Sequence, residues 1–299
     1  MAQKENRKYK NSMFVDLFFE DESAEKNDIA LYNALHDETL PEGTKVKKIR
    51  IDDVLYMGFK NDISFGIGSK IMIFGEHQST INENMPLRSL MYIGRAYEQL
   101  VPIRERYKKK QVYLPKPEFY TFYNGQEHWA KEKVLHLSDA YKVSDADAML
   151  ELTVKVININ PEQNHWLLDK CPVLKEYGQF VDMVRNLQEK EDADPCKHAV
   201  EECIRQGILS DYLKKKGSEV INMLIAEYDY DLDIEVQREE AYTEGVEKGI
   251  ELGKQQIIAD LVARNLGLGK SPEEIADALG EPLEMVQAVI LSLQAEENK

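Results

Sequence analysis

The segment from Lys60 to Gln78 constrains the fold most, because it combines two short apolar runs with a turn between them. The runs are rich in isoleucine and phenylalanine and are separated by Gly68-Ser69-Lys70, which predicts two antiparallel strands joined by a tight turn. Each run also contains one isolated carboxylate, Asp62 in the first and Glu76 in the second. A carboxylate in a strand that builds a core is costly unless it binds a metal, pairs with a cation or faces water.

The relative position of the two carboxylates depends on the register of this hairpin. A three-residue turn pairs Ile67 with Ile71, and counting back from that pair puts Asp62 directly opposite Glu76. A two-residue turn would instead direct Asp62 away from Glu76. We predict the first register, in which opposite Cβ atoms lie about 4.5–5.5 Å apart. Two carboxylates at that distance can share one divalent cation, and they repel each other if none is bound.

Strand alternation adds a glutamine to the same face. Residues two apart in a strand share a side, so Gln78 projects with Glu76 while His77 points to the other face. Two carboxylates with backbone carbonyls and waters suit Mg²⁺ or Mn²⁺, which prefer oxygen ligands. Such an ion can polarise a phosphodiester, supply a hydroxide-like nucleophile and stabilise the leaving oxygen.

Hydrophobic periodicity predicts two parts of different character, a mixed αβ part up to about residue 160 and an almost entirely helical part beyond it. We expect three segments: a core over 1–160, a helical extension over 161–233, and a long helix with a helical hairpin tail over 234–299. The expected strands are 46–59, 62–67, 71–78, 118–123 and 150–159. The expected helices are 11–20, 28–36, 85–108, 172–190, 195–206, 208–231 and 234–266.

The formal net charge of −16 argues against a simple nucleic-acid binder, because the molecule as a whole repels phosphate. The charge is unevenly distributed, however: residues 1–115 carry 18 Lys and Arg against 17 Asp and Glu, and the remainder carries 20 against 37. Any contact with DNA is therefore expected in the first part. No stretch approaches the roughly 20 apolar residues that span a bilayer, and no secretory signal is evident, so we expect a cytoplasmic protein without membrane contact.

The cysteines Cys171, Cys196 and Cys203 are too few and too irregularly spaced for a disulfide framework. His198 lies between the last two, but this spacing is not that of a recognised zinc site. A structural zinc is therefore the weaker interpretation. We expect ordinary buried thiols.

Four short motifs carry a family resemblance: Asn61-Asp62, Glu76-His77-Gln78-Ser79, Met85-Pro86-Leu87-Arg88 and Phe122-Tyr123-Asn124-Gly125. Together they resemble the Rpn family of recombination-promoting nucleases, also called PD-(D/E)XK nuclease family putative transposases, over most of the chain. The resemblance implies an α/β (α+β) PD-(D/E)XK-type core, with a mixed central sheet flanked by helices and followed by a mostly helical C-terminal half. It also implies a metal-dependent endonuclease that hydrolyses DNA phosphodiesters.

The resemblance further implies roles for individual residues. Asp62 and Glu76 would ligate Mg²⁺, or Mn²⁺ in its place, with the backbone carbonyl of His77 as a third ligand. Gln78 occupies the place of the lysine in the wider superfamily, and it can orient the attacking water but supplies no positive charge. Lys60 or Lys70 could restore that charge from a neighbouring position, and we favour Lys60.

Contacts with DNA are expected at basic residues of the first part. Arg88 could touch a phosphate or hold Glu76 in a structural ion pair. The cluster that ends in Lys108, Lys109 and Lys110 could contact the DNA backbone, or form a solvated helix end that favours the helix dipole. Lys60 completes the set of expected DNA contacts.

Structural alternatives apply to the carboxylates as well. Asp62 could cap a turn, Glu76 could serve only its ion pair with Arg88, and His77 is most simply a packed strand histidine. The second functional reading is therefore a degenerate nuclease fold that acts as an interaction or DNA-binding regulatory protein.

The C-terminal segment, residues 234–299, has features that are typical of helix–helix packing. Gly245, Gly249 and Gly253 recur at four-residue spacing in a helix too charged to span a membrane, which predicts close packing against a partner helix such as its own copy in a homodimer. The hairpin that begins at Ser271 has a capping-box start. Its second helix, 283–293, contains no lysine or arginine, which favours packing or oligomerisation over DNA reading.

Overall fold

The computed structural model describes residues 13–41, 43–50, 62–68, 71–143 and 148–297. The chain forms two compact units, residues 1–227 and residues 228–299. The boundaries expected at residues 160 and 233 stay predictions, because compactness alone does not define a domain that folds by itself. Residues 51–59 of the predicted strand 46–59 lie outside the described residues. The lysines Lys60 and Lys70 lie outside them as well.

The described part of the first unit contains a six-stranded mixed sheet in the order β1-β2-β3-β4-β6-β5. Strands β3, β4 and β6 run parallel in its middle, and the remaining neighbours are antiparallel. The expected mixed α/β architecture is therefore confirmed. The strands are β1 (Val46–Lys48), β2 (Ile63–Ile67), β3 (Ile71–Gln78), β4 (Lys116–Tyr123), β5 (Glu132–His136) and β6 (Thr153–Asn158).

The β2–β3 hairpin has the predicted register. Ile67 pairs with Ile71, and the ladder continues back to the pair of Ile63 with Gly75. Gly68, which begins the turn, has a φ of 57°, a left-handed conformation that glycine adopts without strain. The next position along the ladder brings Asp62 opposite Glu76.

Helices precede, interrupt and follow the sheet. In the first unit they are α1 (Met13–Val15), the π-helical turn η3 (Asp16–Glu20), α2 (Ala24–His36), α3 (Met85–Leu100), α4 (Ile103–Arg106), α5 (Trp166–Lys170), α6 (Pro172–Glu189) and α7 (Pro195–Gln206). Short 3₁₀ turns lie at η4 (Leu137–Ala140) and η5 (Pro161–Gln163). Helix α8 (Ser210–Gly267) continues into the second unit, where α9 (Pro272–Leu279) and α10 (Leu283–Glu297) follow.

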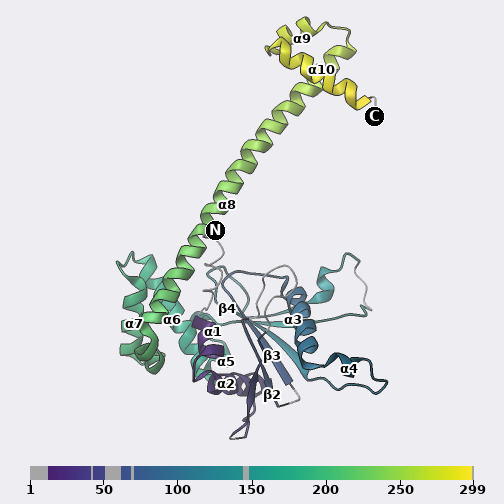
Figure 1. Cartoon of the computed structure of the whole chain (residues 1–299). Helices are drawn as coiled ribbons and strands as arrows, with labels where there is room; N and C mark the ends of the chain where they lie inside the picture. The colour runs from purple at the N-terminus through teal and green to yellow at the C-terminus, as the bar shows by residue number, and fades with distance from the viewer. Residues whose placement is uncertain (1–12, 42, 51–61, 69–70, 144–147, 298–299) are drawn as a thin grey trace. The chain divides into compact units, whose positions relative to one another are not determined.

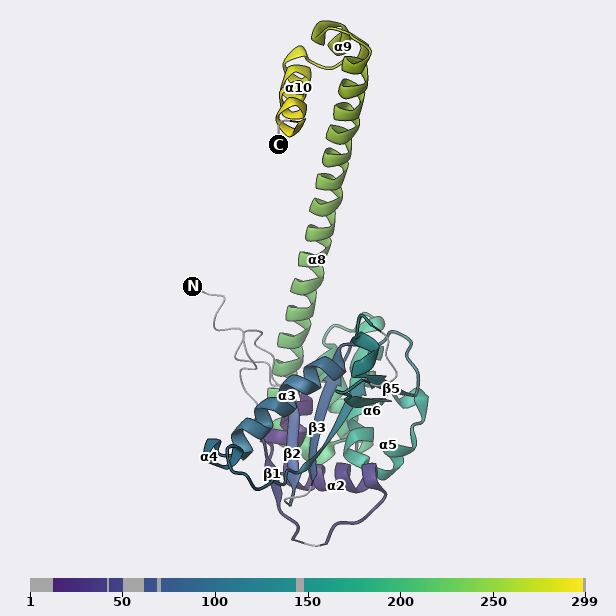
Figure 2. The same cartoon turned by 90° about the vertical axis from the view of Figure 1, so that its right-hand side faces the viewer.

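The two faces of the sheet bury different sets of residues. Helix α3 covers one face, where Tyr92 and Ile93 pack on Met72 and Phe74 of β3. Helices α1, α2, α5 and α6 cover the other face around Ile73 (Figures 1 and 2). Because even-numbered residues of β3 face α3 and Ile73 faces away, Glu76 and Gln78 belong to the α3 face.

The structure differs from the predicted elements in three main respects. Helix α3 ends at Leu100 rather than near Lys108, because Pro102 disfavours helical backbone at Val101, which is extended with φ −106° and ψ 108°. Strand β5 was missed, since it is a mostly exposed edge strand without a clear apolar pattern. The helices expected over 208–231 and 234–266 form one continuous helix, α8, because no proline or glycine interrupts their junction.

The three cysteines are buried free thiols, as predicted. In the second unit, Ser271 and Glu274 form the predicted capping box at the start of α9, and Val262, Ile275 and Val286 form a small core of their own. No helix in the described ranges combines the length and the apolar character needed to cross a membrane.

Two helical glycines offer a matched test of the packing. A Cβ at Gly178 in α6 would lie 2.7 Å from the carbonyl oxygen of Ile159, whereas a Cβ at Gly94 in α3 would meet nothing within 4 Å. We expect Gly178→Ala to lower the free energy of unfolding by about 1–3 kcal/mol, because the backbones must separate. Gly94→Ala should raise it by up to about 1 kcal/mol through helix propensity. Urea denaturation of both variants checks this, and a stable Gly178→Ala variant would contradict the close approach of α6.

Candidate functional site

The site is built around Glu76, whose carboxylate is almost completely buried in β3, with 3% of the residue exposed. Arg88, in the first turn of α3, places its Nη2 atom 2.9 Å from Oε2 of Glu76. Arg88 also donates hydrogen bonds from Nε and Nη2 to the hydroxyl of Tyr92, at 3.3 and 3.0 Å. Residues four apart on a helix share a face, so one stretch of α3 supplies both groups.

The electrostatics of the three groups are coupled. Burial is the largest single influence on the guanidinium and disfavours its charged form, but Glu76, Tyr92 and Asp62 together more than offset it and raise the pKa of Arg88. Burial, together with the charge of Glu76, also raises the pKa of Tyr92. Arg88 therefore stays charged and Tyr92 stays protonated, and the buried carboxylate has the cation that it requires.

Asp62 adjoins Glu76 through the backbone, directly before β2 begins. Its carboxylate oxygen Oδ2 accepts a hydrogen bond of 2.7 Å from the backbone N–H of His77. Its own backbone N–H donates to Oε1 of Glu76 at 3.3 Å. The two side chains thus extend the β2–β3 ladder by one step, which holds both carboxylates at one point of the hairpin.

His77 lies on the opposite face of the sheet, as predicted. Its ring stacks on Phe14 with centroids 5.2 Å apart, and Nε2 lies 3.1 Å from the hydroxyl of Tyr177. These rings cover part of the half-buried imidazole, and its desolvation lowers the pKa of His77 to about 4. Because the side chain is directed away from Glu76, only the backbone of His77 could join a metal site there.

Gln78 is the last residue of β3 and is half-buried on the Glu76 face. Its carbonyl accepts a hydrogen bond of 3.0 Å from the backbone N–H of Asn124, which closes the end of β3 onto β4. Gly125 follows, and a Cβ there would lie only 2.1 Å from the carbonyl oxygen of Ser79. The Asn124-Gly125 pair therefore allows the two strand ends to meet closely.

Thr121 is a site residue that sequence reasoning missed. It pairs with Glu76 in the parallel register of β3 and β4, so its side chain lies on the same face. Its hydroxyl oxygen is buried and has no hydrogen-bond partner in the part of the chain that the structure describes. A lone threonine in an apolar strand carries no signal of this, because only the pairing of β3 with β4 brings it beside Glu76.

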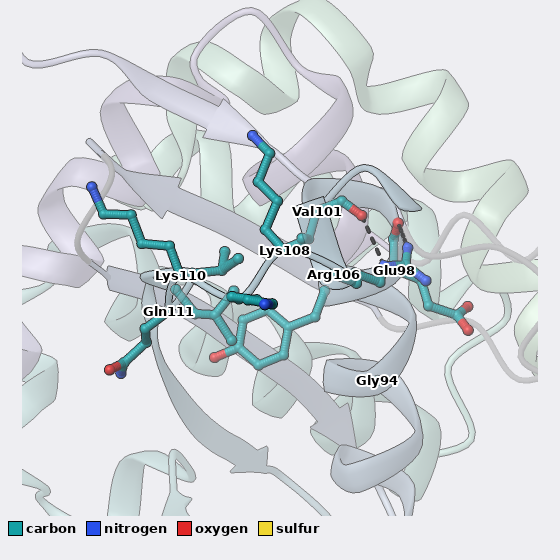
Figure 3. Close-up of a pocket in the computed structure, with 11 residues that line it drawn as sticks. Gly94, Glu98, Val101, Arg106, Lys108, Lys110 and Gln111 are labelled. Atoms are coloured by element: carbon teal, nitrogen blue, oxygen red, sulfur yellow. Dashed lines mark hydrogen bonds between the residues drawn. The ribbon is translucent and has the colours of Figure 1, made fainter. Parts of the chain in front are cut away.

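The expected DNA-contacting lysines do not all join this site. Lys108, Lys109 and Lys110 line a separate pocket beside the C-terminal half of α3 (Figure 3). Arg88 lies in the first turn of that helix. Lys60 lies outside the described residues. The structure therefore brings together Asp62, Glu76, Arg88 and Tyr92, with Gln78 on the same face, and separates them from the lysine cluster.

The donor set suits a hard divalent cation with one condition. Two adjacent carboxylates and the unpartnered hydroxyl of Thr121 offer oxygen ligands of the kind that Mg²⁺ prefers. Within the described ranges no group of three or more His, Cys, Asp or Glu side chains is arranged to hold a metal, so waters and backbone oxygens would have to complete the shell. Because Glu76 already pairs with Arg88, its carboxylate would have to interact with the metal ion and with Arg88 at the same time.

The ion pair is tested by a double-mutant cycle. We expect Arg88→Met to lower the free energy of unfolding by about 3–5 kcal/mol, because it leaves the buried carboxylate of Glu76 without its cation. Adding Glu76→Gln should recover most of this loss. The control on the same helix is Arg95→Met, whose more exposed pair with Glu98 should contribute less than about 1 kcal/mol. Additive losses in the cycle would show that the two side chains do not depend on each other.

His77 should make stability depend on pH. An unfolded histidine titrates near 6.5 and the folded one near 4, so only the unfolded chain gains the proton between these values. We expect the wild-type protein to lose up to about 3 kcal/mol relative to a His77→Gln variant as the pH falls from 6.5 to 4. Denaturation curves measured across this range check it. Parallel pH profiles for the two proteins would contradict the lowered pKa of His77.

No family model, no curated protein and no solved structure matches the chain. The family that the sequence motifs resemble is therefore not shown by a relative. The chemistry of the site has to be argued from its own contacts, those of Asp62, Glu76 and Arg88.

Proposed function

We propose that the chain is a metal-dependent DNA endonuclease with a PD-(D/E)XK-type core. The observation that supports this most is the position of Asp62 opposite the buried Glu76, at the end of a strand that runs parallel to its neighbour. Carboxyl ends of parallel strands are a common place for binding sites, because side chains from several strands converge there. A buried carboxylate and a half-buried one brought together at that place need a partner of positive charge.

Asp62, Glu76 and Gln78 have different roles in the proposed hydrolysis. A Mg²⁺ or Mn²⁺ ion held there would polarise the phosphodiester and lower the pKa of a bound water. Asp62 and Glu76 would hold the ion, with the carbonyl of His77 as the further protein ligand. The amide of Gln78, on the same face, orients the attacking water.

Arg88 offers a positive charge in place of the superfamily lysine, whose position is occupied by Gln78. Gln78 carries no charge, but the guanidinium of Arg88 lies 2.9 Å from Glu76 and is held there by Tyr92. A fixed cation at this point stabilises negative charge that develops on a phosphoryl oxygen. We therefore assign the electrostatic role of the absent lysine to Arg88.

The same ion pair supports the second candidate function. Because Arg88 already compensates the buried carboxylate, Glu76 is satisfied without any metal. In that case the core is a degenerate nuclease fold, and the chain acts as an interaction or DNA-binding regulatory protein. Calorimetric titration with Mg²⁺ separates the two functions, because only the enzyme requires the ion to bind between Asp62 and Glu76.

A plasmid-nicking assay with Mg²⁺, Mn²⁺ and Ca²⁺ tests the enzyme. We expect Asp62→Asn to reduce cleavage more than about 100-fold, since a direct ligand contributes more than the outer partners of metal sites, which contribute about 10–100-fold. The control is Asp139→Asn, which removes an exposed carboxylate elsewhere in the first unit. Thermal denaturation verifies that both variants fold.

The outcomes are distinct. Undiminished cleavage by Asp62→Asn would remove the carboxylates from the mechanism. Absence of cleavage by the wild-type protein, together with absence of Mg²⁺ binding, would favour the interaction protein.

A further inference from the structure

A pocket of about 510 Å³ lies beside the C-terminal half of α3, where the segment that follows α4 folds back along the helix (Figure 3). This volume falls within the range of about 300–1,000 Å³ that is usual for small-ligand sites. Gly94, Glu98 and Val101 line it from the helix and the residue that follows it. The lining residues from α4 and the segment after it are Arg106, Lys108, Lys109, Lys110, Gln111, Val112 and Leu114.

The pocket is positively charged in a protein that is strongly negative overall. Arg106 supports its shape, because its guanidinium donates hydrogen bonds to the carbonyl oxygens of Val101 and Glu98. Lys108 pairs with Glu105, and across the described residues no ion pair is recorded for Lys109 or Lys110. A local excess of lysine on an acidic molecule favours an anionic ligand.

The walls between the charges are apolar. Tyr97, Val101, Val112 and Leu114 contribute aromatic and aliphatic surface. The hydroxyl of Tyr97 donates to the carbonyl oxygen of Pro115 at 2.8 Å, which holds the ring in place. A fixed aromatic ring beside lysines suits a nucleotide, because the ring stacks on a base while the ammonium groups meet its phosphates.

An exposed stripe of α3 runs from the pocket toward the first turn of the helix, which carries Arg88. Leu87 and Met91 are 42% and 39% exposed, and they share one stripe of α3 with Gly94 and Glu98 at spacings of three and four residues. Arg88 and Gly94 are six residues apart, or about 9 Å along the helix at about 1.5 Å per residue.

We propose that this pocket binds a nucleotide of single-stranded DNA while a phosphodiester of the same strand lies at the Glu76 site. This inference rests on the proposed nuclease function. A duplex can lay its backbone on a ridge of lysines, but filling a concave pocket with a base requires unpairing at a cost of a few kcal/mol. The preferred substrate is therefore DNA with a single-stranded segment, such as an overhang or a bubble.

Gly94 provides the sharpest test. It lines the pocket, and a side chain there has open space in front of it, so Gly94→Trp fills the pocket without a backbone clash. The matched control is Gly94→Ala, which adds only a methyl group. Binding is measured by fluorescence anisotropy without divalent cations, using a labelled single strand of DNA and a blunt duplex of the same sequence. Circular dichroism verifies that both variants fold.

We expect Gly94→Trp to weaken binding of the single strand at least about tenfold, because base stacking contributes about 1–3 kcal/mol. Binding of the blunt duplex should change less than about twofold, since backbone contacts remain available. Gly94→Ala should bind both probes as the wild-type protein does. Equal single-strand affinity in Gly94→Trp and wild type, or no preference of the wild type for the single strand, would overturn the proposal.

The lysines are tested through salt dependence. Lys109→Gln with Lys110→Gln should flatten the slope of log affinity against log salt for the single strand by about 1.4, as expected for two phosphate contacts. The control is Lys190→Gln with Lys197→Gln, which removes the same charge from exposed positions outside the pocket. An unchanged slope in the first pair would place the phosphates elsewhere.

The nucleotide-binding role of the pocket and the nuclease function can be contradicted independently of each other. Asp62→Asn should bind the single strand like the wild type while losing cleavage. Undiminished cleavage by Asp62→Asn would defeat the nuclease assignment and leave the anisotropy result standing. Wild-type affinity in Gly94→Trp, together with loss of cleavage in Asp62→Asn, would defeat the pocket assignment alone.

Discussion

The buried carboxylate of Glu76 is the constraint on which the first unit depends. A charge inside a sheet needs a partner, and Arg88 and the backbone N–H of Asp62 supply it from the two neighbouring elements. One side chain thereby joins the hairpin, the central strand β3 and helix α3. Any loss of register in the hairpin would separate Asp62 from Glu76, so the site and the packing depend on the same pairing.

Helix α3 organises two regions of opposite charge. Its first turns face the sheet with Arg88 and Tyr92 and complete an acidic site, whereas its last turns form one wall of a basic pocket. The apolar stripe of Leu87 and Met91 lies between them on the exposed side. In an acidic protein, the pocket gathers positive charge in a small area at the C-terminal half of the same helix.

Much of the site could be predicted from local sequence, because a hairpin is a local structure. The turn at Gly68 and the alternation of apolar residues set the register, and that register placed Asp62 opposite Glu76 and His77 on the other face. The end of α3 was mispredicted although Pro102 marks it, and β5 was missed because an exposed edge strand has little apolar pattern. Thr121 could not be found, since its place depends on parallel pairing between distant segments.

The sequence by itself therefore determined the hairpin, its two carboxylates and their relative position, since these follow from neighbouring residues and strand geometry. It left open whether Arg88 would hold Glu76 and where the lysine cluster would lie. The tertiary structure decided both, because the packing of α3 on the sheet brings Arg88 to the buried carboxylate and leaves Lys108, Lys109 and Lys110 around a separate pocket. Contacts of this kind depend on how distant segments fold onto one another, which no local pattern specifies.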